Sequence, residues 1–183
     1  MFNRTASTSE SVSYNQIGQT MLSKTDLLNA ILKECRTCIH LHGKIPEGAL
    51  DYRPTPKQRS TLELLRYLSF CGFGFADAAV SDNWDSYMKL DEAAKTMEAP
   101  DFPQAMKNQM AQLTALFASI SDDDFANKEV VGLVNEKMTL GVLLLDSTYR
   151  FMVGYKMQLF LYIKASGGAS LGTDDCWFGE CDE

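Results

Sequence analysis

Tyrosines and a glutamine recur at helical spacing near the end of the chain, in the segment 144–166. At 100° per residue, a helix places Tyr155, Gln158 and Tyr162 within about 80° of Phe151. Phenol and carboxamide groups both donate and accept hydrogen bonds, and each needs a partner when buried. On one inward face, they could hold a small organic ligand. An aromatic face of this kind also serves as ordinary core packing.

A second group with ligating chemistry lies near the start, in the sequence ECRTCIHLH. Cys35, Cys38 and His42 share one face of an expected helix, and His40 points away from it toward solvent. A structural zinc site usually takes its close cysteine pair from a turn and needs further ligands, and a thioredoxin-like site needs a βαβ unit. The thiols are therefore expected to be small core side chains. A displaced metal site at Cys35, Cys38 and His42 is the alternative.

The acidic tail ASLGTDDCWFGECDE has no helical period. Trp177 is expected to dock on the helices or on a second subunit, or to form a lid over a pocket. The tail cysteines, Cys176 and Cys181, are assigned no disulfide. The run 122–124 of three aspartates lacks the alternating ligands, the glycine and the distal glutamate of an EF-hand, so a solvated helix end is expected.

Four long helices must position these groups. Ser60 and Glu63 form a capping-box signature before one of them, and Gly167 with Gly168 ends the last. A connection rich in proline and glycine spans 43–59, and a short strand is expected in EVVGL. Connections of such unequal length indicate an all-α fold, a four-helix bundle with a long crossover connection. The expected helices are Ser23–His42, Ser60–Val80, Asp101–Ser121 and Thr139–Ser166.

Composition limits the classes of partner. The chain has 183 residues and is expected to form a loose arm over 1–20 and a single domain over 21–183. A net charge of −7 without a basic cluster argues against nucleic acid. No apolar run is long enough for a membrane span or a signal peptide, and five cysteines suit reduced thiols, so a cytoplasmic protein without a membrane partner is expected.

Two segments resemble the DinB-like superfamily, a group of four-helix-bundle proteins described as metalloenzymes. DYRPTPKQRSTLELLRYL resembles the family's loop and R-S-x-x-E-L-L-x-H-L helix, and GYKMQLFLYIKASG resembles its H-R-x-Q-L-x-x-Y-L helix. The resemblance covers residues 20–173 and implies the fold and a homodimer. It also implies a metal site of three histidines, at positions occupied here by Tyr67, Phe151 and Tyr155.

These three residues predict that the family's metal site is absent. Phenylalanine has no lone pair to offer, and a phenol with a pKa near ~10 is a poor ligand for a divalent metal. We therefore expect no metal and no cofactor. No base or nucleophile is evident beside the rings, so no catalytic residue is assigned.

The first functional hypothesis is a protein that binds a small organic molecule in an aromatic interior pocket. The pocket would be lined by Tyr67, Phe151 and Tyr155, with Gln158, Cys38 and His42 as further candidates. One alternative is a thiol-dependent transferase, which the resemblance implies, working with a displaced metal. The other is a structural or interaction protein whose cavity is filled by side chains.

Overall fold

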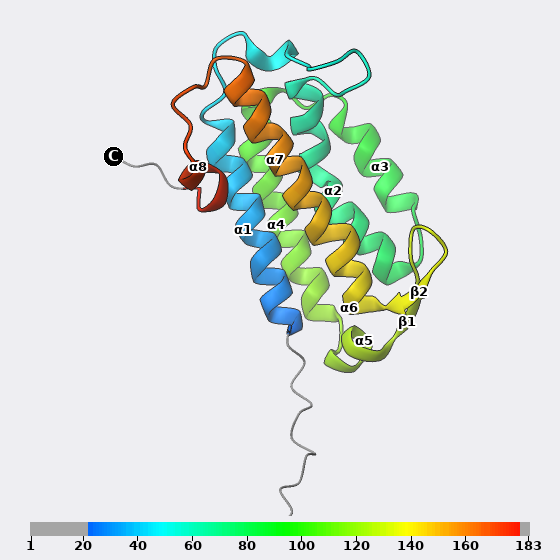
Figure 1. The fold of residues 1–183 in the computed structure, drawn as a ribbon. Helices are drawn as coiled ribbons and strands as arrows, with labels where there is room; N and C mark the ends of the chain where they lie inside the picture. Colours follow the sequence, from blue (N-terminus) through cyan, green and yellow to red (C-terminus); the bar gives the residue numbers. More distant parts are fainter. Residues whose placement is uncertain (1–21, 180–183) are drawn as a thin grey trace, which may run out of the picture.

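The computed structural model describes residues 22–179, and four long helical stretches form its core (Figure 1). These are α1 (Lys24–His42), α2 (Thr61–Ser81), α4 (Phe102–Ser119) and a final stretch from α6 (Leu140–Leu143) to α7 (Arg150–Ala165). Between α6 and α7 the helix widens into a π-helical segment, Leu144–Tyr149. The prediction of an all-α bundle is confirmed.

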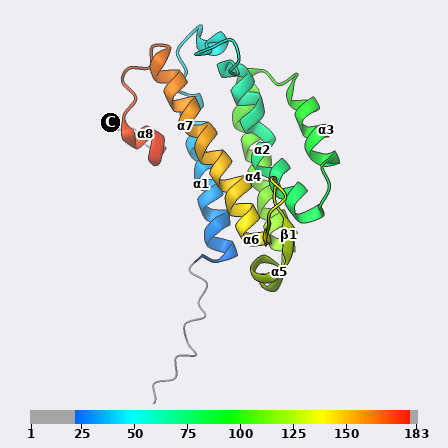
Figure 2. The same ribbon diagram turned by 45° about the vertical axis from the view of Figure 1, so that its right-hand side comes forward.

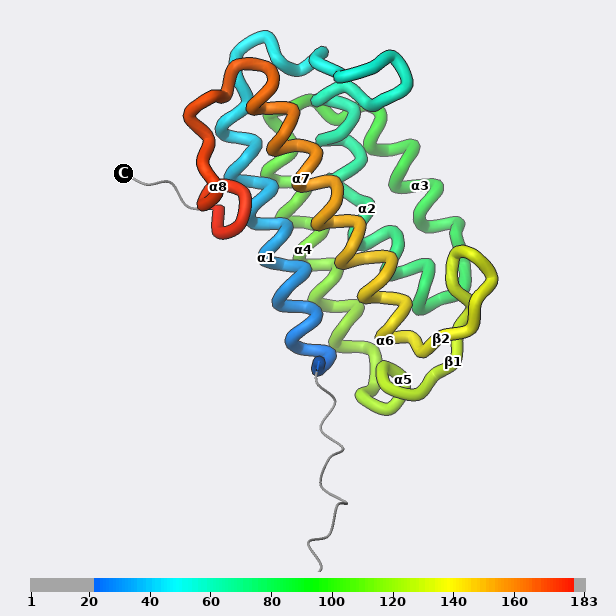
Figure 3. The backbone as a smooth tube through the Cα atoms, in the orientation of Figure 1, coloured from blue at the N-terminus to red at the C-terminus, as the bar shows by residue number. Residues whose placement is uncertain are grey.

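The order of the helices in space requires crossover connections. Helices α1 and α2 each pack beside both α4 and α7, so α1 and α2 occupy opposite corners of the bundle. The connection between them, with the 3₁₀ turn Ala49–Asp51, runs across one end of the bundle (Figure 3). Residues Phe102, Phe117, Leu27, Ile31, Leu41, Leu64, Leu65, Leu68, Met106 and Leu113 are fully buried between the helices.

Local signals fix where the first two helices begin. Ser23 caps α1 by accepting from the Asp26 N–H, and the Asp26 carboxylate accepts from the Ser23 N–H. The expected capping box of α2 forms, since the Glu63 N–H donates to Ser60 Oγ at 3.2 Å and the Ser60 N–H donates to Glu63 Oε2 at 2.7 Å. Each box satisfies N–H groups that would otherwise lack partners at the helix start.

Three short helices lie outside the four long stretches. Helix α3 (Asp85–Ala94) lies outside the bundle against α2 (Figure 2), α5 (Asp122–Asn127) follows the cap Ser121, and α8 (Thr173–Trp177) lies in the tail. The expectation that the tail lacks helix is wrong, because α8 packs on α1 and α7 and is stabilised by that contact rather than by its own periodicity.

Two further details concern the connections. A 3₁₀ turn, Ala99–Asp101, precedes α4, and Asp101 makes no side-chain cap to that helix; its carboxylate accepts from the Glu98 N–H at 3.3 Å. The expected strand forms as β1 (Glu129–Val131), antiparallel to β2 (Lys137–Thr139) with Val130 opposite Met138.

No helix within residues 22–179 combines the length and apolar character needed to cross a bilayer.

Candidate functional site

Seven aromatic side chains form a continuous row on the side of α2 that faces α3 and α7. We call this set the aromatic row: Tyr67, Phe70 and Phe75 of α2, Trp84 and Tyr87 at the start of α3, and Phe151 and Tyr155 of α7. The ring centroids of Tyr67 and Tyr155 lie 4.7 Å apart, and those of Phe75 and Phe151 lie 4.9 Å apart. All eight ring pairs within the aromatic row meet edge-on or tilted, as the quadrupoles of the rings favour.

Tyr87 ties α3 to this row. Its ring lies 5.3 Å from Phe70 and 5.1 Å from Phe75, and its hydroxyl shares a hydrogen bond with that of Tyr67. Burial raises the pKa of Tyr67 and that of Tyr87 above the ordinary phenol value. Both groups are therefore neutral hydrogen-bonding groups at neutral pH.

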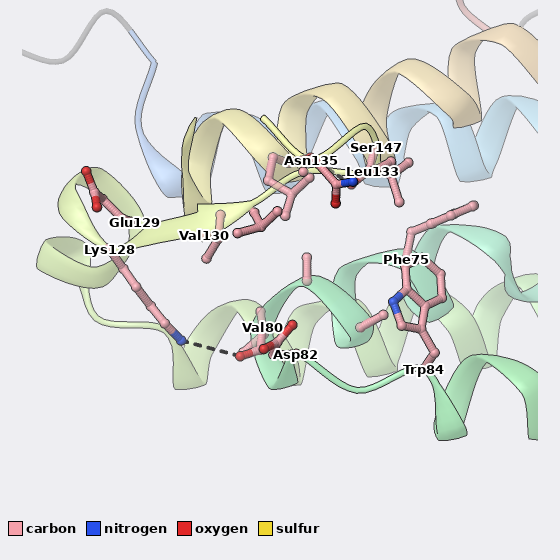
Figure 4. A pocket seen from close by; sticks show the side chains of 15 residues that line it. Phe75, Val80, Asp82, Trp84, Lys128, Glu129, Val130, Leu133, Asn135 and Ser147 are labelled. Carbon is pink, nitrogen blue, oxygen red and sulfur yellow. Dashed lines mark hydrogen bonds between the residues drawn. The ribbon is translucent and has the colours of Figure 1, made fainter. Parts of the chain in front are cut away.

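A cavity of about 430 Å³ opens beside one end of the row (Figure 4). Phe75 and Trp84 line one side, and Val130 and Leu133 of the β-hairpin line the other. Its polar lining comes from Asp82, Lys128, Glu129, Asn135 and Ser147. The lining therefore offers both an apolar wall and groups that can orient a polar substituent.

The π-helical segment helps to shape this end of the site. Ser147 lies in it and lines the cavity, while its hydroxyl donates to the carbonyl of Leu143 at 2.7 Å. Segments of this kind insert one residue into a helix and are frequent at functional sites. Phe151 lies two residues after the segment, and its ring contacts that of the cavity residue Phe75.

The other end of the row carries a cation from the chain itself. The guanidinium carbon of Arg59 lies 3.9 Å from the ring centroid of Tyr67 and 5.6 Å from that of Tyr155. The Arg59 carbonyl accepts from the Tyr162 hydroxyl at 3.1 Å, and Gln158 donates in turn to that hydroxyl. Gln158 and Tyr162 thus hold the backbone that carries Arg59.

The structure brings together some of the predicted pocket residues. Tyr67, Phe151 and Tyr155 share the aromatic row, and Gln158 is linked to it through the Tyr162–Arg59 contact. Cys38 is buried on α1, within the core. His42 Nε2 lies 2.8 Å from the carbonyl oxygen of Ala99, and its ring lies 5.4 Å from Phe102, so it faces α4 rather than the row.

The residues at the positions where the resemblance implies metal-binding histidines do not fit a metal. Phe151 has no donor atom, and the raised pKa of Tyr67 keeps its phenol protonated. The Arg59 guanidinium over Tyr67 adds a positive charge that would repel a metal cation.

The displaced metal site also finds no support in the described part of the chain. Within residues 22–179, no group of three histidine, cysteine or acidic side chains is arranged to hold a metal ion. Burial raises the pKa of Cys35 to about 12 and raises the pKa values of Cys38 and Cys71 above that of an ordinary thiol. Thiols that stay protonated are poor metal ligands and poor nucleophiles.

Sequence reasoning missed a buried ion pair on the opposite side of α7. The Lys156 ammonium lies 2.7 Å from Glu34 Oε2 of α1, and Lys156 is 0% exposed. Helix α8 covers the pair, with the Trp177 ring centroid 4.8 Å from Lys156 Nζ. Trp177 does dock on the bundle, one of the expected alternatives.

A second charged contact fixes α8 in place. His40 Nε2 lies 2.7 Å from Asp175 Oδ1, and both side chains are largely buried, so the expectation that His40 points to solvent is wrong. Sequence periodicity could not predict this contact, because the helical wheel of α1 contains no information about a partner 135 residues later in the chain.

Comparison with known proteins supports the fold. No family model matches the sequence, and no curated protein matches it. Among solved structures, a DinB-like protein, YjoA from Bacillus subtilis, aligns over 77% of this chain and 92% of its own, with a TM-score of 0.59 and 20% sequence identity. At this level of identity the likeness concerns the backbone arrangement. The chain therefore has the fold of a DinB-like protein, as its two resembling segments predicted.

Proposed function

We propose that this protein binds a small organic molecule in the cavity beside Phe75 and Trp84. The observation that carries the proposal is the cavity itself, about 430 Å³ in volume, at the end of a row of aromatic rings. This volume is within the range of sites for small ligands, and ring faces and edges bind apolar and aromatic groups.

The lining favours a ligand with an apolar body and one polar substituent. Phe75, Val130 and Leu143 provide apolar surface, and Lys128 and Glu129 provide charges of both signs. Lys128 is already engaged, since its ammonium donates to the carbonyl of Val80 at 3.4 Å (Figure 4). Phe75 lines this cavity, and its ring also contacts that of Phe151, one of the residues predicted to line a pocket.

Filling the cavity tests the proposal. Ala79→Leu adds side-chain volume to the cavity wall, while Ala115→Leu makes the same change on an exposed face of α4. We expect fragments that bind the wild-type protein, detected by ligand-observed NMR, to bind Ala115→Leu equally and Ala79→Leu at least about tenfold more weakly. Equal binding to both variants, or a fragment set with no binder, would exclude the proposal.

Three narrower statements stay predictions. A homodimer rests on the resemblance, and a cytoplasmic location rests on composition. A pocket lined by six residues rests on helical spacing and on the resemblance: Tyr67, Phe151, Tyr155, Gln158, Cys38 and His42. The hypothesis of a structural or interaction protein whose interior cavity is filled by side chains also stays a prediction.

A further inference from the structure

The end of the aromatic row farthest from the cavity has the geometry of a cation site. The rings of Tyr67 and Tyr155 meet at 67° with centroids 4.7 Å apart, which makes a corner between α2 and α7. Ring faces carry negative potential and attract cations within about 6 Å of the centroid. The Arg59 guanidinium occupies this corner, 3.9 Å from one ring and 5.6 Å from the other.

One carboxylate at the start of α2 interacts with the Arg59 charge. The pKa of Glu63 is lowered chiefly by its hydrogen bond from Ser60 and also by the positive charges of Arg53 and Arg59. Arg59 therefore interacts electrostatically with this carboxylate. With Arg59 removed, the faces of the two rings would favour another cation at this position.

Arg59 can leave the corner without disturbing the helices. Its backbone carbonyl is held by the Tyr162 hydroxyl, and Ser60 next to it caps α2. The Arg59 residue is nevertheless exposed, so its side chain can rotate into solvent while its backbone stays in place. The occupant of the corner is therefore exchangeable, and the walls of the corner are fixed.

We propose that Tyr67 and Tyr155 form a binding site for an organic cation, a quaternary ammonium or guanidinium compound, and that Arg59 occupies this site until such a compound displaces it. The proposal goes beyond the ligand cavity, because none of the residues that line that cavity takes part. The two sites lie at opposite ends of the same row.

Choline and its uncharged isostere 3,3-dimethylbutan-1-ol are suitable probes, because they share a shape and differ in charge. We expect Arg59→Ala to bind choline about 3- to 30-fold more tightly than the wild-type protein does, in NMR titrations at constant ionic strength. Arg36→Ala, which removes an exposed charge from α1, should change the affinity less than about twofold. The isostere should gain nothing from Arg59→Ala.

Second substitutions identify the rings as the binding surface. Arg59→Ala with Tyr67→Phe should keep the gain, since a ring remains, whereas Arg59→Ala with Tyr155→Leu should lose it. Tyr155 is only half-buried, so the leucine variant is expected to fold, which circular dichroism checks. Equal binding of choline and its isostere to Arg59→Ala, or no gain over the wild-type protein, would overturn the cation site. Either result would leave the effect of Ala79→Leu on the cavity unchanged.

Discussion

Lys156 is a charged residue placed where solvent does not reach it. The ammonium is paired with Glu34 at 2.7 Å, and the Trp177 ring covers it at 4.8 Å. A buried charge is tolerated when a partner compensates it, but removing that partner leaves the desolvation penalty in full. The pair therefore makes α1, α7 and α8 depend on one another for stability.

Glu34→Gln should lower the free energy of unfolding by about 3–5 kcal/mol, because it leaves the buried Lys156 charge without a partner. Replacing both residues, Glu34→Leu with Lys156→Met, should recover most of this loss, since no buried charge remains. Asp146→Asn breaks the exposed pair with Arg150 and should cost less than about 1 kcal/mol. Urea denaturation measures all three. A loss for Glu34→Gln no larger than that for Asp146→Asn would contradict the account.

At the scale of helices, α3 is attached to the bundle by a close approach to α2. A β-carbon built on Gly74 would lie 2.9 Å from Cδ2 of Tyr87, closer than such atoms pack. Glycine at this position therefore permits the tyrosine to reach the aromatic row. Gly154 on α7 differs, because a β-carbon there would meet no atom within 4 Å.

These two glycines make a matched test. Gly74→Ala should lower the stability by about 1–3 kcal/mol, because the Tyr87 ring must move from its packed position. Gly154→Ala should raise it by about 0.5–1 kcal/mol, since alanine loses less backbone entropy in a helix and has open space here. Thermal denaturation followed by circular dichroism gives both signs. Destabilisation by both substitutions to the same extent would show that the contact with Tyr87 is not what requires glycine.

For the whole molecule, three buried thiols connect stability to alkaline pH. Burial raises the pKa of Cys35 from 9.0 to about 12 and also raises the pKa values of Cys38 and Cys71. Between pH 9.0 and about pH 12, the unfolded chain releases the Cys35 proton while the folded chain keeps it. The unfolded state then binds fewer protons, so stability falls as the pH rises above 9.0.

Each such thiol should lower the free energy of unfolding by about 1.4 kcal/mol for every pH unit in that window. Cys35→Ala should make the decline shallower by that amount between about pH 9.5 and 10.5, where the linkage is near its full slope. Urea denaturation in a reducing buffer at a series of pH values measures the slope. An unchanged slope in Cys35→Ala would mean that the thiol is not shielded from water.

Local signals explain which parts of the fold could be predicted. The long helices and the Ser60–Glu63 capping box depend on residues close in sequence, so spacing sufficed. Helix α8 has only five residues and depends on contacts with α1 and α7, which no local pattern encodes. The same limit applies to His40, whose partner Asp175 lies at the other end of the chain.

The candidate site could be predicted only in part for a similar reason. Helical spacing put Phe151 and Tyr155 on one face, and the resemblance paired them with Tyr67, which the structure places beside Tyr155. The cavity could not be predicted, because the β-hairpin that forms one wall lies far from Phe75 in sequence. Lys156 escaped notice because its side of α7 would face solvent without α8.

The positions of Trp84 and Trp177 give the molecule two optical reporters. Trp84 lines the cavity and Trp177 lies against the Lys156 ammonium, at 44% and 46% exposure, and the chain has two tryptophans in total. A nearby cation and a changing solvent boundary both alter indole emission. If Trp177 is replaced by phenylalanine, the emission of Trp84 reports ligand binding in the cavity. If Trp84 is replaced instead, the emission of Trp177 reports detachment of the tail from the bundle.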